Sequence, residues 1–172
     1  MATTQDCEDV RAVYLCAFPE NERVIVSALA VSLLSESTNP PTISLIAESD
    51  GLVAGHVAFS PVSIDGDEDL QGYILAPLGV RSAFQKRRIG SQLVDYGLQK
   101  LKKAGVNIVF VYGDPRYYGR LGFRSDTAGR YTPPYELQYP LGWQARALTE
   151  FYSERESVQL SCVASLCDPE LW

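Results

Sequence analysis

The chain has 172 residues, 46% of them hydrophobic, and carries a formal net charge of −6 with a pI of about 4.8. This length and apolar content are typical of one globular domain, here residues 1–172. The negative charge argues against nucleic acid and anionic membranes as partners. The sequence shows neither a run of roughly 18 apolar residues nor a signal-peptide pattern, so we expect a cytoplasmic location.

The cysteines and the histidine do not form a metal-binding pattern. The four cysteines, Cys7, Cys16, Cys162 and Cys167, show no Cys-x-x-Cys spacing, and His56 is the single histidine. A structural zinc site needs four thiolate or imidazole ligands at close spacing, so no metal is expected. The thiols are interpreted as free and buried.

Two helices are predicted near the start of the chain. In residues 9–18, Val10, Val13 and Tyr14 share one helical face, and Asp6 before them is a favoured N-cap residue. Residues 21–35 form a second, broadly apolar helix.

A β-hairpin should follow these helices, with strands at residues 42–47 and 52–60 around the turn Glu48–Gly51. After the hairpin, residues 65–69 form an acidic run. This run is not a calcium loop, because Ala76 stands where the bidentate glutamate is required. We interpret it either as a solvated loop or as a carboxylate cluster that attracts a cationic amine.

Residues 74–112 have the pattern of a βαβ unit. A strand at 74–80 leads into a basic turn, a helix from Ser91 and a buried strand at 106–112, and Gly105 suits the left-handed position after the helix. The free N–H groups of the helix start lie just past the strand, beside Lys86, Arg87 and Arg88. This arrangement predicts an anion site, most simply for phosphate, although three basic residues also suit a solvated face.

Two stretches carry a resemblance to a known family. The turn Gln85-Lys86-Arg87-Arg88-Ile89-Gly90 and the later GDPRYYGRLGF, residues 113–123, resemble the acetyl-CoA motif of the GNAT superfamily of N-acetyltransferases. The second stretch is similar to the GDPxYYGRFGF motif of a subgroup of small, bacterial-type acetyltransferases. The resemblance implies an α/β fold whose sheet is mixed and mostly antiparallel, splayed at the parallel strands 74–80 and 106–112, with helices on both faces. The family's opening strand would here be very short or missing.

The resemblance also implies where acetyl-CoA, the co-substrate, would bind. The residues implied for the pyrophosphate are Gln85, Lys86, Arg87, Arg88, Gly90 and Ser91, and those for pantetheine and the thioester carbonyl are Leu78, Gly79 and Val80. Gly79 would ease a bulge or serve as a packing glycine. Arg88 stands where the family usually has glycine, so it either uses an ordinary φ or crowds the site.

For the chemistry, the resemblance assigns the general acid to Tyr118, because a phenol stays protonated at neutral pH and can protonate a thiolate. Tyr117 is interpreted as packing or as a substrate wall. Asp114, followed by Pro115, is first a helix N-cap. The general base is left open among His56, Glu48, Glu68 and water, and a lone histidine in a strand is more often a hydrogen-bonded core residue.

The sequence gives weaker signals for the residues that line the acceptor site than for those of the cofactor motif. The resemblance places the ends of the first two helices near the acceptor, including Phe18, Glu20, Glu22 and Arg23, although ordinary helix ends explain these residues too. At the C-terminal end, residues 131–135 are predicted to be extended, and 143–148 and 158–164 to be strands. The aromatic residues in this region either form part of the hydrophobic core or contact an apolar substrate.

The resulting hypothesis is direct transfer of an acetyl group from acetyl-CoA to a small-molecule or peptide amine in a ternary complex. No cysteine lies near the motif to form a covalent intermediate. The alternative is a CoA-sensing or protein-binding module on the same fold, and homodimer formation is left open. An enzyme built on a P-loop is disfavoured, because Gly-x-x-x-x-Gly-Lys-[Ser/Thr] is absent.

Overall fold

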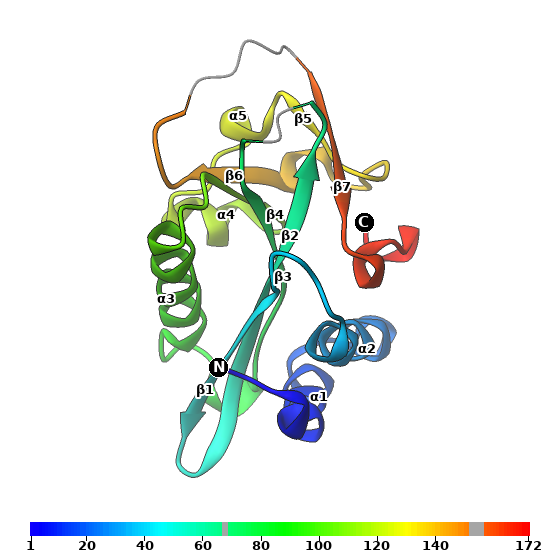
Figure 1. The fold of residues 1–172 in the computed structure, drawn as a ribbon. Coiled ribbons are helices and arrows are strands. Elements are labelled where there is room, and N and C mark those ends of the chain that lie inside the picture. Colours follow the sequence, from blue (N-terminus) through cyan, green and yellow to red (C-terminus); the bar gives the residue numbers. More distant parts are fainter. Residues whose placement is uncertain (67–68, 152–156) are drawn as a thin grey trace.

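The computed structural model describes residues 1–66, 69–151 and 157–172. A central sheet separates two layers of helices, with α3 on one face and α1 and α2 on the other (Figure 1). The helices are α1 (Cys7–Ala17), α2 (Glu20–Ser35), α3 (Ile89–Lys103), α4 (Pro115–Tyr118) and α5 (Ser125–Ala128). The helices predicted at residues 9–18, at 21–35 and from residue 91 are confirmed, with ends shifted by one or two residues.

The sheet has seven strands in the order β5-β7-β2-β3-β4-β6, with β1 paired to β2. The strands are β1 (Ile43–Ser49), β2 (Leu52–Ile64), β3 (Gly72–Val80), β4 (Ile108–Tyr112), β5 (Tyr131–Thr132), β6 (Trp143–Ala147) and β7 (Val158–Cys162). The β3–β4 and β5–β7 pairs are parallel, and the other pairs among the described strands are antiparallel. The expectation of a mixed, mostly antiparallel sheet with helices on both faces is therefore confirmed.

The parallel strands β3 and β4 separate part-way along their length. Their paired register runs from Gly72 with Ile108 to Leu75 with Val111 and stops there. β3 continues to Val80 alongside β2, and two of its residues, Ala76 and Pro77, lie opposite Ala58 alone. The extra residue is a bulge that re-aims the strand. The bulge lies ahead of Gly79, so the suggestion that Gly79 eases it is wrong.

Gly79 is instead required by packing. A methyl group at this position would lie 2.8 Å from Cε1 of Tyr14 and 3.2 Å from Cγ1 of Val13, both on α1. The first helix therefore sits directly on the splayed part of β3.

Helix α3 packs closely on the other face of the sheet. A methyl group at Gly97 would overlap the ring of Phe59 on β2, so the glycine lets helix and sheet approach. The helix ends in a Schellman motif: the N–H of Val106 donates to the carbonyl of Leu101, and Gly105 has φ +87°. The predicted left-handed Gly105 is confirmed.

The segment before α1 is a short 3-10 helix, Thr4–Asp6, and the N–H of Ala2 donates to the carbonyl of Ser44. Asp6 is the residue before α1, as predicted, but its carboxylate does not cap that helix. It accepts from the N–H of Thr3 at 2.7 Å, so it stabilises the 3-10 turn instead.

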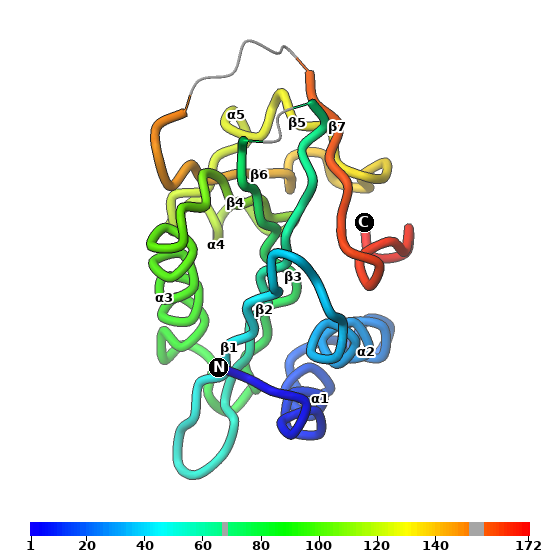
Figure 2. The backbone as a smooth tube through the Cα atoms, viewed as in Figure 1, coloured from blue at the N-terminus to red at the C-terminus, as the bar shows by residue number. Residues whose placement is uncertain are grey.

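The C-terminal segment folds back beside α2 (Figure 2). Just past the end of α2, the carboxylate of Glu36 accepts from the N–H groups of Ala164 and Ser165 at 2.9 and 3.1 Å. The indole N–H of Trp172 donates to the carbonyl of Leu166 at 3.0 Å. Strands β6 and β7 were both predicted, but they lie on opposite sides of the β2–β3 pair.

The four thiols are free, as expected, but they are not buried: Cys16 and Cys167 are exposed, and Cys7 and Cys162 are partly exposed. Among the described residues, no group of three or more His, Cys, Asp or Glu side chains is placed to hold a metal ion. No helix in the described ranges has the length and apolar character needed to cross a membrane.

Candidate active site

A cavity of about 500 Å³, here called the donor cavity, lies where β3 ends and α3 begins. It contains most of the residues predicted for the cofactor. Those lining it are Leu78, Val80, Gln85, Lys86, Arg88, Gly90 and Ser91, joined by Phe84, Ile89, Tyr117 and Arg120. The N–H groups of the first turn of α3 have no acceptor within the helix, so this cavity combines free donors, a positive dipole end and three cationic side chains.

Arg88 adopts the backbone conformation that glycine favours. Its φ and ψ are 65° and 10°, and Lys86 has a φ of 62°. Of the two alternatives for Arg88, an ordinary φ is therefore wrong: the turn keeps its left-handed shape and the arginine bears the strain. The side chain still lines the donor cavity.

Two predicted cofactor residues lie outside this lining. The guanidinium of Arg87 lies 3.9 Å from the carboxylate of Asp50 and 5.2 Å from the ring centroid of Phe84. Gly79 is covered by Tyr14 and Val13. Neither residue therefore contributes a side chain to the lining of the donor cavity.

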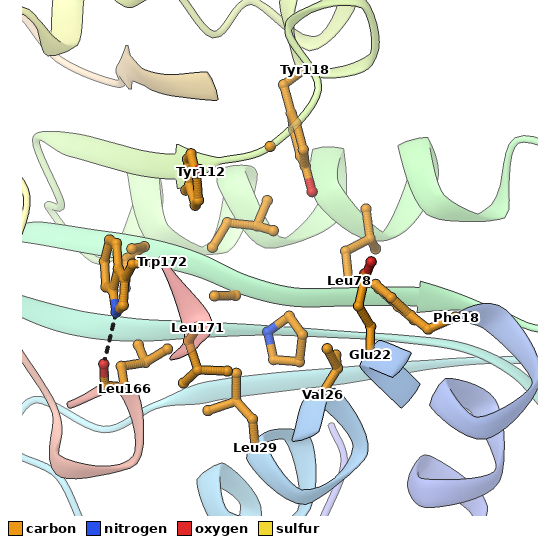
Figure 3. A pocket seen from close by; sticks show the side chains of 15 residues that line it. Phe18, Glu22, Val26, Leu29, Leu78, Tyr112, Tyr118, Leu166, Leu171 and Trp172 are labelled. Atoms are coloured by element: carbon orange, nitrogen blue, oxygen red, sulfur yellow. Dashed lines mark hydrogen bonds between the residues drawn. The ribbon is translucent and has the colours of Figure 1, made fainter. Parts of the chain in front are cut away.

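A second cavity of about 370 Å³ opens on the other side of the splay (Figure 3); it is here called the acceptor cavity, after the role that the resemblance predicts for Phe18 and Glu22. One wall comes from the start of α2 and the segment before it, including Phe18, Glu22 and Val26; the opposite wall comes from Leu171 and Trp172. Glu20 and Arg23, predicted beside them, line neither cavity and pair with each other at 2.9 Å.

Tyr118 and Leu78 lie where the two cavities approach each other. Leu78 lines both cavities, and Tyr118 lines the acceptor cavity with its hydroxyl pointing into the space (Figure 3). The ring of Tyr118 packs edge-on to Phe123 at 5.7 Å between centroids and fits against Gly113, where a methyl group would lie 2.5 Å from Cε2. Asp114 starts this short helix by accepting from the N–H of Arg116 at 2.8 Å, as predicted.

The hydroxyl of Tyr118 is held in its neutral form. Burial raises the pKa of Tyr118 above its usual value, and the neighbouring Tyr117 adds to the rise. Its ring is perpendicular to that of Tyr117, with centroids 5.0 Å apart, and Tyr117 faces the donor cavity. The two adjacent tyrosines therefore line different cavities.

His56 lies in the core rather than in either cavity. The Tyr14 hydroxyl is 2.7 Å from Nδ1 of His56 and 3.1 Å from the carbonyl oxygen of Pro77, and the Ser44 hydroxyl is 2.6 Å from Nε2. Burial lowers the pKa of His56 to about 4, and nearby Asp6 opposes this with a smaller effect. The imidazole is therefore neutral, and through Tyr14 it supports the bulged part of β3.

This buried histidine predicts a stability that depends on pH. The folded pKa is about 4 and the ordinary value is 6.5, so between these values the unfolded chain binds more protons and stability falls as pH falls. From about pH 7.5 to about pH 5, we expect the free energy of unfolding to drop by about 2 kcal/mol, as measured by urea denaturation. The variant His56→Gln should lack this drop; an equal drop in both proteins would assign it to other groups.

The remaining candidates for a base are not gathered at the site. Glu48 lies in β1 and lines neither cavity, and Glu68 lies outside the described residues, as does Asp67 of the acidic run. Among the described residues, neither His56 nor Glu48 is placed in the acceptor cavity to act as the base.

Comparisons with known proteins show which family the chain belongs to. A model of the Acetyltransferase (GNAT) family matches residues 7–123, which is more than half of the chain. The chain belongs to this family. As a GNAT protein it is an N-acetyltransferase, as the sequence predicted.

Relatives of this acetyltransferase cover most of its length. It is 32% identical over 148 residues to "Uncharacterized N-acetyltransferase YjhQ" of Escherichia coli strain K12, over 84% of this chain and 80% of the relative. The crystal structure of the GNAT family N-acetyltransferase YhbS from Escherichia coli in complex with CoA has a TM-score of 0.76 and 28% identity, over 90% and 84% of the two chains. A GNAT family acetyltransferase from Brucella melitensis in complex with acetyl-CoA has a TM-score of 0.66 and 30% identity, over 94% and 92%.

Several lining residues were not predicted. Arg120 lies in the donor cavity with its guanidinium 5.6 Å from the ring centroid of Tyr117, and the i, i+3 spacing of the pair was the signal that could have revealed it. Tyr112, Leu171 and Trp172 line the acceptor cavity through long-range packing, for which no local sequence signal exists.

Proposed function

We propose that this acetyltransferase binds acetyl-CoA in the donor cavity and transfers the acetyl group directly to an amine held in the acceptor cavity. The observation that carries this proposal is that Leu78 lines both cavities. A thioester reaching Leu78 from one side would therefore meet an amine from the other. We also infer from residues 113–123 that the chain belongs with the acetyltransferases that carry the GDPxYYGRxGF motif.

The residues of the donor cavity fit the chemistry of CoA. The N–H groups of Ile89, Gly90 and Ser91 at the start of α3 would donate hydrogen bonds to the pyrophosphate oxygens. Lys86 and Arg88 would add charge-assisted contacts. Beyond Leu75, β3 no longer pairs with β4. The carbonyls of Pro77 and Val80 accept from Tyr14 and Gln85, and other backbone groups of this part of β3 would bind the pantetheine amides and the thioester carbonyl.

In the proposed reaction, a neutral amine nitrogen attacks the thioester carbonyl. A C–N bond forms, the C–S bond breaks, and the nitrogen loses a proton to water in the acceptor cavity. The leaving thiolate accepts a proton from the hydroxyl of Tyr118, which is restored from solvent. Because burial raises the pKa of Tyr118, the hydroxyl stays protonated and ready to donate throughout the neutral pH range.

Calorimetric titration with acetyl-CoA and initial-rate kinetics test this proposal. We expect micromolar binding and rate patterns that intersect when both substrates are varied, because both must be bound before transfer.

Arg88→Gly should bind acetyl-CoA as well as wild type or more tightly, since backbone amides hold the phosphates and glycine removes the strain at φ 65°. A large loss of affinity in this variant would assign the phosphate contact to the arginine side chain. Binding of acetyl-CoA without release of CoA in the presence of any amine tested would favour the CoA-sensing module.

A further inference from the structure

We infer that the acceptor is a cationic primary amine carried on an apolar, ring-sized body without a carboxylate of its own, and that Glu22 is the residue that selects it. This inference rests on the proposed function, since it concerns the acceptor of that reaction. It is carried by the shape, the lining and the charges of the acceptor cavity and of the cavity next to it.

The acceptor cavity presents apolar surfaces, including the faces of two aromatic rings. Tyr112 and Trp172 stack with centroids 6.4 Å apart and an interplanar angle of 12°. The Trp172 indole N–H donates to the carbonyl of Leu166, and the Tyr112 hydroxyl accepts from the N–H of Tyr139 at 2.9 Å while its own proton can still be donated. The rings therefore offer a ligand mainly apolar contact.

A third cavity of about 660 Å³ lies beside the acceptor cavity and shares Glu22, Tyr112 and Trp172 with it. Its lining adds two more carboxylates, Asp114 and Glu170. Among the described residues that line these two cavities there is neither lysine nor arginine. An entering molecule with a carboxylate or a phosphate would meet like charge and no cationic partner, whereas an ammonium group would be attracted.

The donor cavity has the opposite character. Its charged lining residues are Lys86, Arg88 and Arg120, without a carboxylate among the described residues that line it. The molecule thus separates its two substrates by charge on either side of Leu78, which lines both cavities.

Glu22 is the carboxylate best placed to bind the acceptor as an ammonium ion, which releases one proton to water before its neutral nitrogen attacks the thioester. Glu20, two residues earlier, is paired with Arg23 at 2.9 Å, and Asp114 accepts from the N–H of Arg116. The Glu22 side chain has no hydrogen bond or ion pair with the described part of the chain. Its carboxylate points into the cavity between Phe18 and Leu78, toward the region that the hydroxyl of Tyr118 also faces (Figure 3).

The first experiment compares two matched amines, 2-phenylethylamine and L-phenylalanine, which share the ring and the amine and differ by a carboxylate. Thiol release and mass spectrometry should show a kcat/KM at least about 10-fold higher for 2-phenylethylamine. Spermidine, a cationic amine without an apolar body, should also be a poorer acceptor. Equal use of phenylalanine, or a preference for spermidine, would overturn the inference while leaving acetyl transfer itself in place.

The second experiment removes the charge of Glu22 without changing its shape. Glu22→Gln should raise KM for 2-phenylethylamine roughly 5- to 10-fold, because Glu22 is exposed and solvent screens its attraction, and should leave KM for acetyl-CoA unchanged. Glu20→Gln is the matched control, since it lies on the same turn of α2 but outside the cavity, and it should leave both constants unchanged. An unchanged amine KM in Glu22→Gln would remove Glu22 from this role.

Binding without turnover separates this inference from the proposed function. Titration of 2-phenylethylamine into the CoA complex should give heat in wild type and at least about fivefold weaker binding in Glu22→Gln. Absence of binding in wild type would overturn the inference whatever the enzyme does with other amines. Binding of the amine with no acetylation of any acceptor would count against the proposed reaction instead.

Discussion

Replacing Tyr118 with phenylalanine should lower kcat about 100-fold or more, because the leaving thiolate would lose its proton donor. The affinity for acetyl-CoA should stay within about twofold, since Tyr118 lines the acceptor cavity and the donor cavity is lined by Tyr117 and the basic turn. The ring that packs against Phe123 and Gly113 is kept in this variant, so its stability should change little. Single-turnover rates and calorimetric titration measure the two effects separately.

Tyr117→Phe is the matched control for this experiment. Tyr117 is adjacent in sequence and carries the same hydroxyl, but it lines the donor cavity. Because it lines the donor cavity, we expect any effect to fall on the KM for acetyl-CoA, with a kcat near that of wild type. An unchanged rate in Tyr118→Phe, or equal losses in both variants, would take the acid role away from Tyr118.

A methyl group added at Gly97 should cost up to about 3 kcal/mol of unfolding free energy, because it would overlap the ring of Phe59 in the core between α3 and the sheet. Helix propensity alone predicts the opposite sign, since alanine is favoured over glycine in a helix by about 1 kcal/mol. The sign of the change measured by urea denaturation therefore decides which effect dominates.

The control for Gly97→Ala is Gly119→Ala. Gly119 has a helical φ of −58°, and a methyl group there would meet nothing within 4 Å. This change should be neutral or slightly stabilising. A stabilised Gly97→Ala variant would show that α3 can move away from the sheet without loss.

The parts of the fold that sequence reasoning predicted are those with local signals. The periodicity of α3, the left-handed Gly105 after it and the β-branched run of β4 are enough to define the βαβ unit from the order of residues alone. The end of the predicted strand then gives the position of the basic turn in the fold. For this reason most of the predicted cofactor residues do line one cavity.

The parts that were wrong depend on contacts that are distant in sequence. Gly79 was interpreted either as easing a bulge or as a packing glycine, and only the second holds, because its absent side chain makes room for Tyr14, which is 65 positions earlier in the chain. The backbone of Arg88 follows the turn geometry set by the surrounding structure rather than the preference of arginine. The role of Trp172 as an acceptor wall depends on the C-terminal segment folding back onto α2, and no pattern in the sequence indicates that.

The origin of the cavity walls along the chain has an evolutionary consequence. The donor cavity is built between Leu78 and Arg120, whereas much of the acceptor cavity comes from residues 18–29 and 166–172. Under the proposed function, substitutions near the two ends of the chain would alter acceptor choice while the acetyl donor is retained. Descendants of one ancestral enzyme would in this way acquire new substrates without rebuilding the region that we propose binds the thioester.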